Sequence, residues 1–208
     1  MLGTLFSDPT SFILSAIGLL VAITIHEFSH AWMADHLGDP TPRLQKRLNL
    51  NPLSHLDLYG VLFMLLIGFG WGKPVVFDPF NLKNPRRDAA LISIAGPVSN
   101  IILAIVLSII VRIFPVSIFI LFPIILINVA LAVFNLLPVA PLDGFKIVGG
   151  ILSPKQAKSW YEMERYGFIF LLALLIPFGQ SSLLSQIIQP MVGFVLKILL
   201  PSSMMDGV

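Results

Sequence analysis

The sequence predicts an all-α polytopic membrane protein with about five transmembrane helices. Of its 208 residues, 56% are hydrophobic and only 12% are charged, and the mean hydropathy is +0.91. Soluble domains are about 45–50% apolar and 25% charged. The second observation is that four long runs carry no charged side chain: 10–25, 89–111, 113–142 and 166–196.

The first three runs predict one crossing each. Run 10–25 has 16 residues, and reaches the roughly 20 that a span needs only if the helix continues to about Asp35. It lacks the positively charged n-region and the small-residue cleavage site of a signal peptide. Run 89–111 fits one crossing, and run 113–142 fits one crossing followed by a non-helical tail.

The last run, 166–196, is long for one helix and short for two. Pro177 to Ser182 has the composition of a tight turn, so two short spans are predicted. A further apolar stretch, Leu58 to Gly72, has 15 residues including four glycines. It is too short and glycine-rich for a spanning helix, so a re-entrant or hairpin segment is predicted near 58–80, with an interfacial segment as the alternative.

Basic residues set the predicted orientation. Regions 37–88 and 144–165 hold eleven of the 13 Lys and Arg residues, and such loops face the cytoplasm. The N-terminus is therefore expected outside. Residues 1–208 are expected to form one integral-membrane domain, with a core at about 10–150 and C-terminal helices at about 153–200.

Charge and cysteine content exclude several function classes. A net charge of +2 is too balanced for a protein that neutralises many phosphates, so nucleic acid is not an expected partner. The absence of cysteine excludes disulfides, a thiolate zinc site and a cysteine nucleophile. Any bound metal must be held by His, Asp or Glu.

The stretch His26-Glu27-Phe28-Ser29-His30 is an H-E-x-x-H pattern on the first apolar helix. Four residues of helix bring both imidazoles to one face, about 6 Å apart, which suits one tetrahedral zinc ion. Glu27, about 100° around the helix, can reach a metal-bound water and act as the general base. The alternative is a polar cluster that holds helices together.

Catalytic zinc needs a third protein ligand and an open fourth position. His36, His55 and the carboxylates are available, and Asp143 is the strongest candidate. It ends the third apolar run, where Pro138 and Pro141 break the helix. The first and third helices also run in the same direction and end at the same leaflet. The alternative role for Asp143 is the N-cap of a helix over 144–152.

These patterns together resemble the site-2 protease family of intramembrane zinc metalloproteases, in the minimal prokaryotic branch without a PDZ or CBS domain. The similarity extends from about residue 18 to 150. It rests on HEFSH at 26–30, AGPVSN at 95–100, NLLPVAPLDG at 135–144, and the stretches 38–41, 48–57 and 68–74. Leu58 and Val75-Val76-Phe77 depart from prolines that are common in the branch, which affects only the path of the hairpin.

The resemblance implies a catalytic core formed by the first three helices. It also implies that His26, His30 and Asp143 bind one catalytic Zn²⁺ ion, that Glu27 is the general base, and that Asn135 lies near the substrate or oxyanion. From its chemistry, Asn135 could equally make a helix–helix hydrogen bond. The implied activity is hydrolysis of peptide bonds in or near transmembrane helices of membrane proteins, close to the cytoplasmic leaflet of a prokaryotic cell membrane.

A substrate helix must unwind before it is cleaved, and the stretch 68–77 could offer it a strand edge. The alternative function is a non-proteolytic metal-binding scaffold or transporter that retains the fold, because intramembrane His and acidic residues also mark ion pathways. Glu27 argues against that alternative, since a scaffold needs the ligands but not the base.

Other polar residues receive weaker interpretations. Gly96 and Asn100 favour close helix packing, with contact to the site as the alternative for Asn100. His36 is interpreted as interfacial, and His55 and Asp57 as solvated loop residues or as groups folded over the site. The remaining basic residues are interpreted as lipid-phosphate and topology anchors: Arg43, Lys46, Arg47, Arg86 and Arg87.

Overall fold

The computed structural model describes residues 7–67, 70–178 and 181–201. Most of its described residues are helical, and the two-residue strands β1 (Pro177–Phe178) and β2 (Ser181–Ser182) pair antiparallel. The predicted all-α class is confirmed.

Three long apolar helices form the body of the fold: α2 (Pro9–His36), α5 (Pro85–Ile113) and α6 (Ile118–Asn135), the last preceded by the short turn η3 (Pro115–Ser117). Within the described residues, these three are long and apolar enough to cross a membrane. The 28 residues of α2 span about 42 Å at 1.5 Å per residue. As predicted, this helix continues through the H-E-x-x-H pattern.

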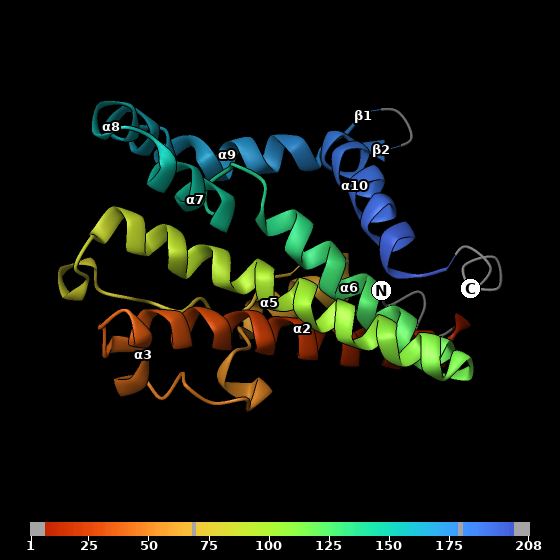
Figure 1. Cartoon of the computed structure of the whole chain (residues 1–208). Coiled ribbons are helices and arrows are strands. Elements are labelled where there is room, and N and C mark those ends of the chain that lie inside the picture. The colour runs from red at the N-terminus through yellow and green to blue at the C-terminus, as the bar shows by residue number, and fades with distance from the viewer. Residues whose placement is uncertain (1–6, 68–69, 179–180, 202–208) are drawn as a thin grey trace.

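Helix α5 packs against both α2 and α6, and it also contacts α7 (Asp143–Ile151). Figure 1 shows the three long helices side by side, with α7 to α10 on one side of them. Buried aliphatic side chains fill the contact between α5, α6 and the last helix, including Ala104, Val111, Ile125, Val129 and Leu196. The contacts of α5 with α2 and with α7 bring the last turns of α2 and the start of α7 together.

The connection from α2 to α5 contains α3 (Thr41–Leu44), η1 (Pro52–Ser54), α4 (Leu58–Ile67) and η2 (Pro79–Asn81). After α4 the chain returns in extended form, and Leu56 bridges to Gly72. The predicted 58–80 hairpin therefore has a helical first arm and an extended second arm. Gly68 and Phe69 lie outside the described residues.

A fully buried carboxylate, Asp39, fastens this connection to the end of α2. It accepts hydrogen bonds from the backbone and hydroxyl of Thr41, from the backbone N–H of Asp78 at 2.7 Å, and from the amide of Asn81 at 2.8 Å. Burial raises the pKa of Asp39, but the hydrogen bonds outweigh burial and the pKa lies below the usual value of 3.8.

The C-terminal run forms two helices, α9 (Glu164–Leu175) and α10 (Leu183–Leu199), which follow α8 (Pro154–Glu162). They separate at the predicted turn, of which residues 179 and 180 lie outside the described part. Helices of 12 and 17 residues extend only about 18 and 26 Å, less than a hydrocarbon core of about 30 Å. The count of five spans therefore stays a prediction.

Candidate metal centre

Two imidazoles and one carboxylate converge where α2 faces the start of α7. Nε2 of His26 lies 3.1 Å from Oδ2 of Asp143, and Nε2 of His30 lies 3.2 Å from the same oxygen. Both histidines are buried and Asp143 is partly buried. The structure thus brings together the three residues that the sequence predicts as ligands.

Asp143 reaches this position because α6 ends at Asn135 and the chain then turns through a proline-containing loop. Gly144 makes the tight turn possible: a Cβ atom there would lie 2.3 Å from the carbonyl oxygen of Leu137. The alternative role of Asp143 as a helix N-cap is wrong, because α7 begins at Asp143 itself and its N-cap is Leu142.

Hydrogen bonds to the other ring nitrogens fix the tautomer of each histidine. Nδ1 of His30 lies 2.7 Å from the carbonyl oxygen of Ile92, which can only accept. Nδ1 of His26 lies 2.7 Å from Oδ1 of Asn100. The amide nitrogen of Asn100 donates to the carbonyl of Ala22, which fixes the orientation of the amide and makes Oδ1 the acceptor. Neutral imidazoles held this way carry their lone pairs on Nε2.

Those lone pairs face a carboxylate oxygen, and a cation bound between the three atoms would turn this repulsive arrangement into a favourable one. Among the described residues, Oδ2 of Asp143 is a buried oxygen without a hydrogen-bond donor. A tetrahedral zinc ion with bonds of about 2.0–2.2 Å holds its ligand atoms about 3.3–3.5 Å apart. The observed separations of 3.1 and 3.2 Å are close to this value, so the donor set fits zinc.

Glu27 lies beside the triad and is held by the returning arm of the hairpin. Its Oε2 accepts a 3.0 Å hydrogen bond from the backbone N–H of Val75. The same oxygen lies 3.7 Å from the guanidinium of Arg47, which also donates to the carbonyl of Lys73. Arg47 is 4% exposed, so its interpretation as a lipid-phosphate anchor is wrong.

Helix α5 meets the two imidazoles at Gly96. A Cβ atom at this position would lie 2.5 Å from Nε2 of His30 and 2.7 Å from Cε1 of His26. No side chain larger than hydrogen fits without displacing a ring. The small-residue face predicted on this helix therefore packs against the candidate ligands His26 and His30.

Comparison with known proteins matches residues 14–118 and 113–176 to the model of peptidase family M50. The chain belongs to peptidase family M50. The predicted membership of the site-2 protease family is thereby confirmed. No solved structure matches the chain.

Three relatives illustrate the similarity of this M50 chain to other proteins. "Putative zinc metalloprotease YwhC" of Bacillus subtilis is 39% identical over 176 residues, which cover 78% of this chain and 80% of the relative. "Putative zinc metalloprotease Rip2" of Mycobacterium tuberculosis H37Rv is 30% identical over 79% of this chain and 67% of the relative. "Zinc metalloprotease MJ0392" of Methanocaldococcus jannaschii is 30% identical over 66% of this chain and 34% of the relative.

The family and these names support a zinc metalloprotease, and the three apolar helices indicate a membrane protein. In this M50 chain Asn135 is the last residue of α6, and its amide donates to the carbonyl of Leu131 in the same helix at 3.0 Å. That hydrogen bond is within α6, so it is not the helix–helix bond considered from the sequence.

The structure also places the remaining histidines. His55 is fully buried and its Nε2 lies 2.8 Å from the carbonyl of Asn49, so the solvated-loop interpretation of this residue is wrong. Asp57 accepts from the N–H of Gly60 at the start of α4. His36 is exposed and stacks on Trp32, as expected of a residue near the end of a span.

Sequence reasoning missed Asn128, which is fully buried on α6 and accepts a 2.8 Å hydrogen bond from the amide of Asn100. The available signal was an asparagine in the middle of an apolar run, where a buried amide requires a polar partner. Its own amide nitrogen donates to the carbonyl of Ile124. Asn128 therefore links α6 to the residue that orients His26.

Proposed function

We propose that this chain is an intramembrane zinc metalloprotease that hydrolyses peptide bonds in or near transmembrane helices of membrane proteins. The observation that carries the proposal is the position of Glu27. Glu27 follows His26 directly in α2 and is not one of the three candidate ligands, and its carboxylate is held by Val75 and Arg47.

In this proposal His26, His30 and Asp143 hold one zinc ion. Bound there, zinc polarises the scissile carbonyl and lowers the pKa of a coordinated water towards neutrality. Glu27 takes the proton of the attacking water and delivers it to the leaving amine. Val75 and Arg47 hold the carboxylate of Glu27 in place for both transfers.

Asn135 is proposed as a donor to the oxyanion that develops on the substrate carbonyl. Its amide is bonded to Leu131, so this role requires that the amide exchange an intrahelical acceptor for the substrate. The side chain is only partly buried, which leaves room for such an exchange.

The depth of the triad supports action within the membrane. His26 and His30 lie ten and six residues before His36, the last residue of α2, or about 15 and 9 Å along the helix axis. Because α2 is about 42 Å long and a hydrocarbon core is about 30 Å thick, these depths support cleavage just inside the membrane, on the side predicted to be cytoplasmic.

The proposal is tested by mapping the cleavage site in a bilayer. The full chain is reconstituted in vesicles with single-span substrates, and mass spectrometry locates the cut. A cut within the substrate's apolar segment is the expected result. Cleavage only of water-exposed segments, or of a soluble peptide equally well, would contradict it. Absence of any cleavage by zinc-loaded protein, across a panel of substrates, would favour the scaffold or transporter alternative.

A further inference from the structure

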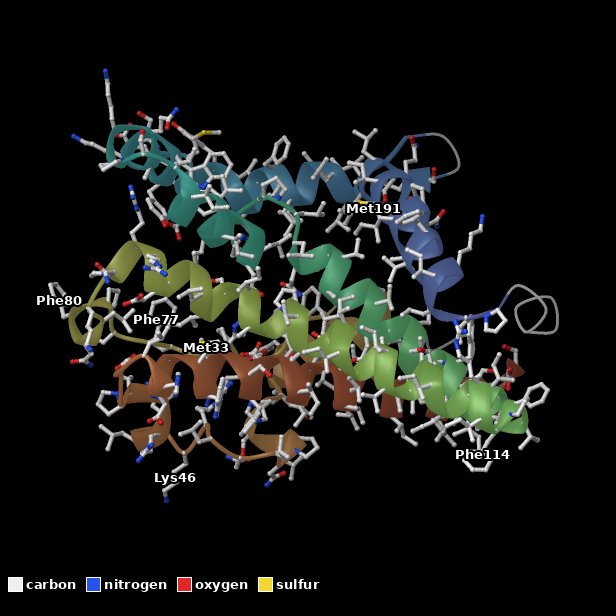
Figure 2. All side chains as sticks on the ribbon, in the orientation of Figure 1. Met33, Lys46, Phe77, Phe80, Phe114 and Met191 are labelled. Carbon is white, nitrogen blue, oxygen red and sulfur yellow. The ribbon has the colours of Figure 1, made fainter. Side chains whose placement is uncertain are left out.

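A cavity of about 510 Å³ lies apart from the zinc-binding residues, where α5 begins. Its walls come from the first turns of α5, from α7 and α8, and from the segment that leads into η2. Figure 1 shows the starts of α5 and α8 at the same end of the molecule, and Figure 2 labels Phe77 on the wall formed by that segment.

Three cations line this cavity: Arg86 of α5, Lys146 of α7 and Lys158 of α8. The lining contains no carboxylate. In the part of the chain that the structure describes, none of the three has an ion-pair partner, whereas Arg43 pairs with Asp35. Three like charges around one cavity repel each other, so an anion bound between them would relieve the repulsion.

The rest of the lining is apolar, with Phe77, Ala89 and Ala157 among its side chains, and with Tyr161 as a further hydroxyl donor. Nζ of Lys146 lies 5.1 Å from the centre of the Phe77 ring. A free inorganic anion would contact only the three basic side chains of this lining. A ligand that carries both a phosphate and hydrocarbon would use the whole lining.

The cavity also lies at the depth of lipid headgroups. Helix α5 has 29 residues and is about 43 Å long, which exceeds a hydrocarbon core of about 30 Å. Its first turns, which line the cavity, therefore extend into the headgroup layer. On the predicted cytoplasmic side, anionic lipids attract basic residues of this kind.

We propose that this cavity binds one anionic phospholipid, with the phosphate among Arg86, Lys146 and Lys158 and the first carbons of its chains against the apolar wall. The site is separate from the catalytic chemistry. Its walls include α7, which begins at Asp143, and the segment that follows Val75, whose backbone N–H binds Glu27. The bound lipid therefore contacts two segments that position residues of the proposed active site.

The test measures lipid binding to the full-length protein in detergent by native mass spectrometry, with short-chain phosphatidylglycerol as the probe. The double variant Arg86→Gln/Lys158→Gln removes two of the three cations. We expect it to weaken binding by about tenfold or more. Arg87→Gln/Lys155→Gln is the matched control, because it removes the same charge from the same two helices at positions that do not line the cavity. We expect it to change binding less than twofold.

An equal loss of phosphatidylglycerol affinity in both double variants would overturn the proposal, because it would indicate that the lipid responds to the overall surface charge and not to this cavity. Short-chain phosphatidylcholine and inorganic phosphate distinguish the source of the phosphate. Both should bind at least about fivefold more weakly than phosphatidylglycerol. If inorganic phosphate or glycerol phosphate bound as tightly as the lipid, the lipid proposal would be wrong. If the double variant failed to fold, the exposed single change Lys158→Gln would replace it, with Lys155→Gln as its control.

Discussion

Oδ1 of Asn100 accepts a 2.7 Å hydrogen bond from Nδ1 of His26, across the contact between α5 and α2. The bond sets the tautomer that leaves Nε2 of His26 free to bind a metal. Partners of this kind orient histidine ligands, and their loss typically weakens metal binding 10- to 100-fold.

Replacing Asn100 with Ala should therefore weaken zinc binding by about 10- to 100-fold, measured by competition with a chromogenic chelator. Ser99→Ala is the control. The hydroxyl of Ser99 bonds to backbone carbonyls rather than to a proposed ligand, so zinc binding should be unchanged. Wild-type affinity in Asn100→Ala would refute the orienting role.

Gly96→Ala should reduce zinc content and proteolysis together, because the added methyl group would lie 2.5 Å from Nε2 of His30. Metal analysis of the purified variant checks the first effect. Gly193→Ala in α10 is the matched control, since a Cβ atom there meets nothing within 4 Å and alanine favours a helix. A fully zinc-loaded, active Gly96→Ala protein would contradict the described packing.

Arg47→Gln should lower kcat by about tenfold, because losing a charge-assisted contact raises the activation free energy by about 1.4 kcal/mol. The zinc content should be unchanged. The reason is that Arg47 contacts Glu27 and the Lys73 carbonyl, but no proposed metal ligand. Arg47→Lys keeps the charge and should recover part of kcat. Loss of zinc in Arg47→Gln, or a change in KM alone, would show that the guanidinium does not act through Glu27.

Asn135→Ala should lower kcat by about a hundredfold, as is typical when an oxyanion donor is removed. Zinc content and melting temperature should change little, because the amide bonds only to Leu131 of its own helix among the contacts described. Kinetics on a cleavable single-span substrate check this. An unchanged kcat would exclude the proposed role.

Asp39 should make stability depend on pH. Its pKa in the folded state lies below the usual 3.8, so its carboxylate stabilises the fold above pH 3.8 and that contribution is lost as pH falls through the lowered pKa. Asp39→Asn should lower the melting temperature at pH 7, and the difference from wild type should shrink below about pH 4. Thermal melts in detergent across this range measure the difference; a constant difference would contradict the assignment.

Much of the fold and of the candidate site could be predicted from local sequence patterns. The spacing of His26 and His30 needs only one helix, and the break before Asp143 follows from prolines in an apolar run. The contacts that the sequence did not reveal join distant segments. Arg47 meets Glu27 only because the connection that follows α2 folds back along that helix, and Asn128 meets Asn100 only once α5 and α6 pack. No periodicity within one segment encodes such pairs.

The glycines of the hairpin give a second example of contacts that local sequence patterns do not reveal. Four glycines between 58 and 72 argued against a spanning helix, and α4, from Leu58 to Ile67, is indeed too short to span. The sequence did not indicate why Gly60 lies within this helix. Gly60 is explained by tertiary structure instead, because a Cβ atom there would lie 1.9 Å from the carbonyl of Trp71 on the returning arm. The close approach of the two arms, rather than local flexibility, accounts for this glycine.

The most direct test of the central claim compares wild type with Glu27→Gln. Both proteins are purified in detergent, their zinc is quantified, and both are incubated with single-span helical substrates. The account predicts one zinc ion per chain in both, and cleavage by the wild type alone, because Glu27 acts as the base and is not a ligand. Cleavage by Glu27→Gln at the wild-type rate, or the absence of zinc from both proteins under zinc-replete conditions, would contradict it.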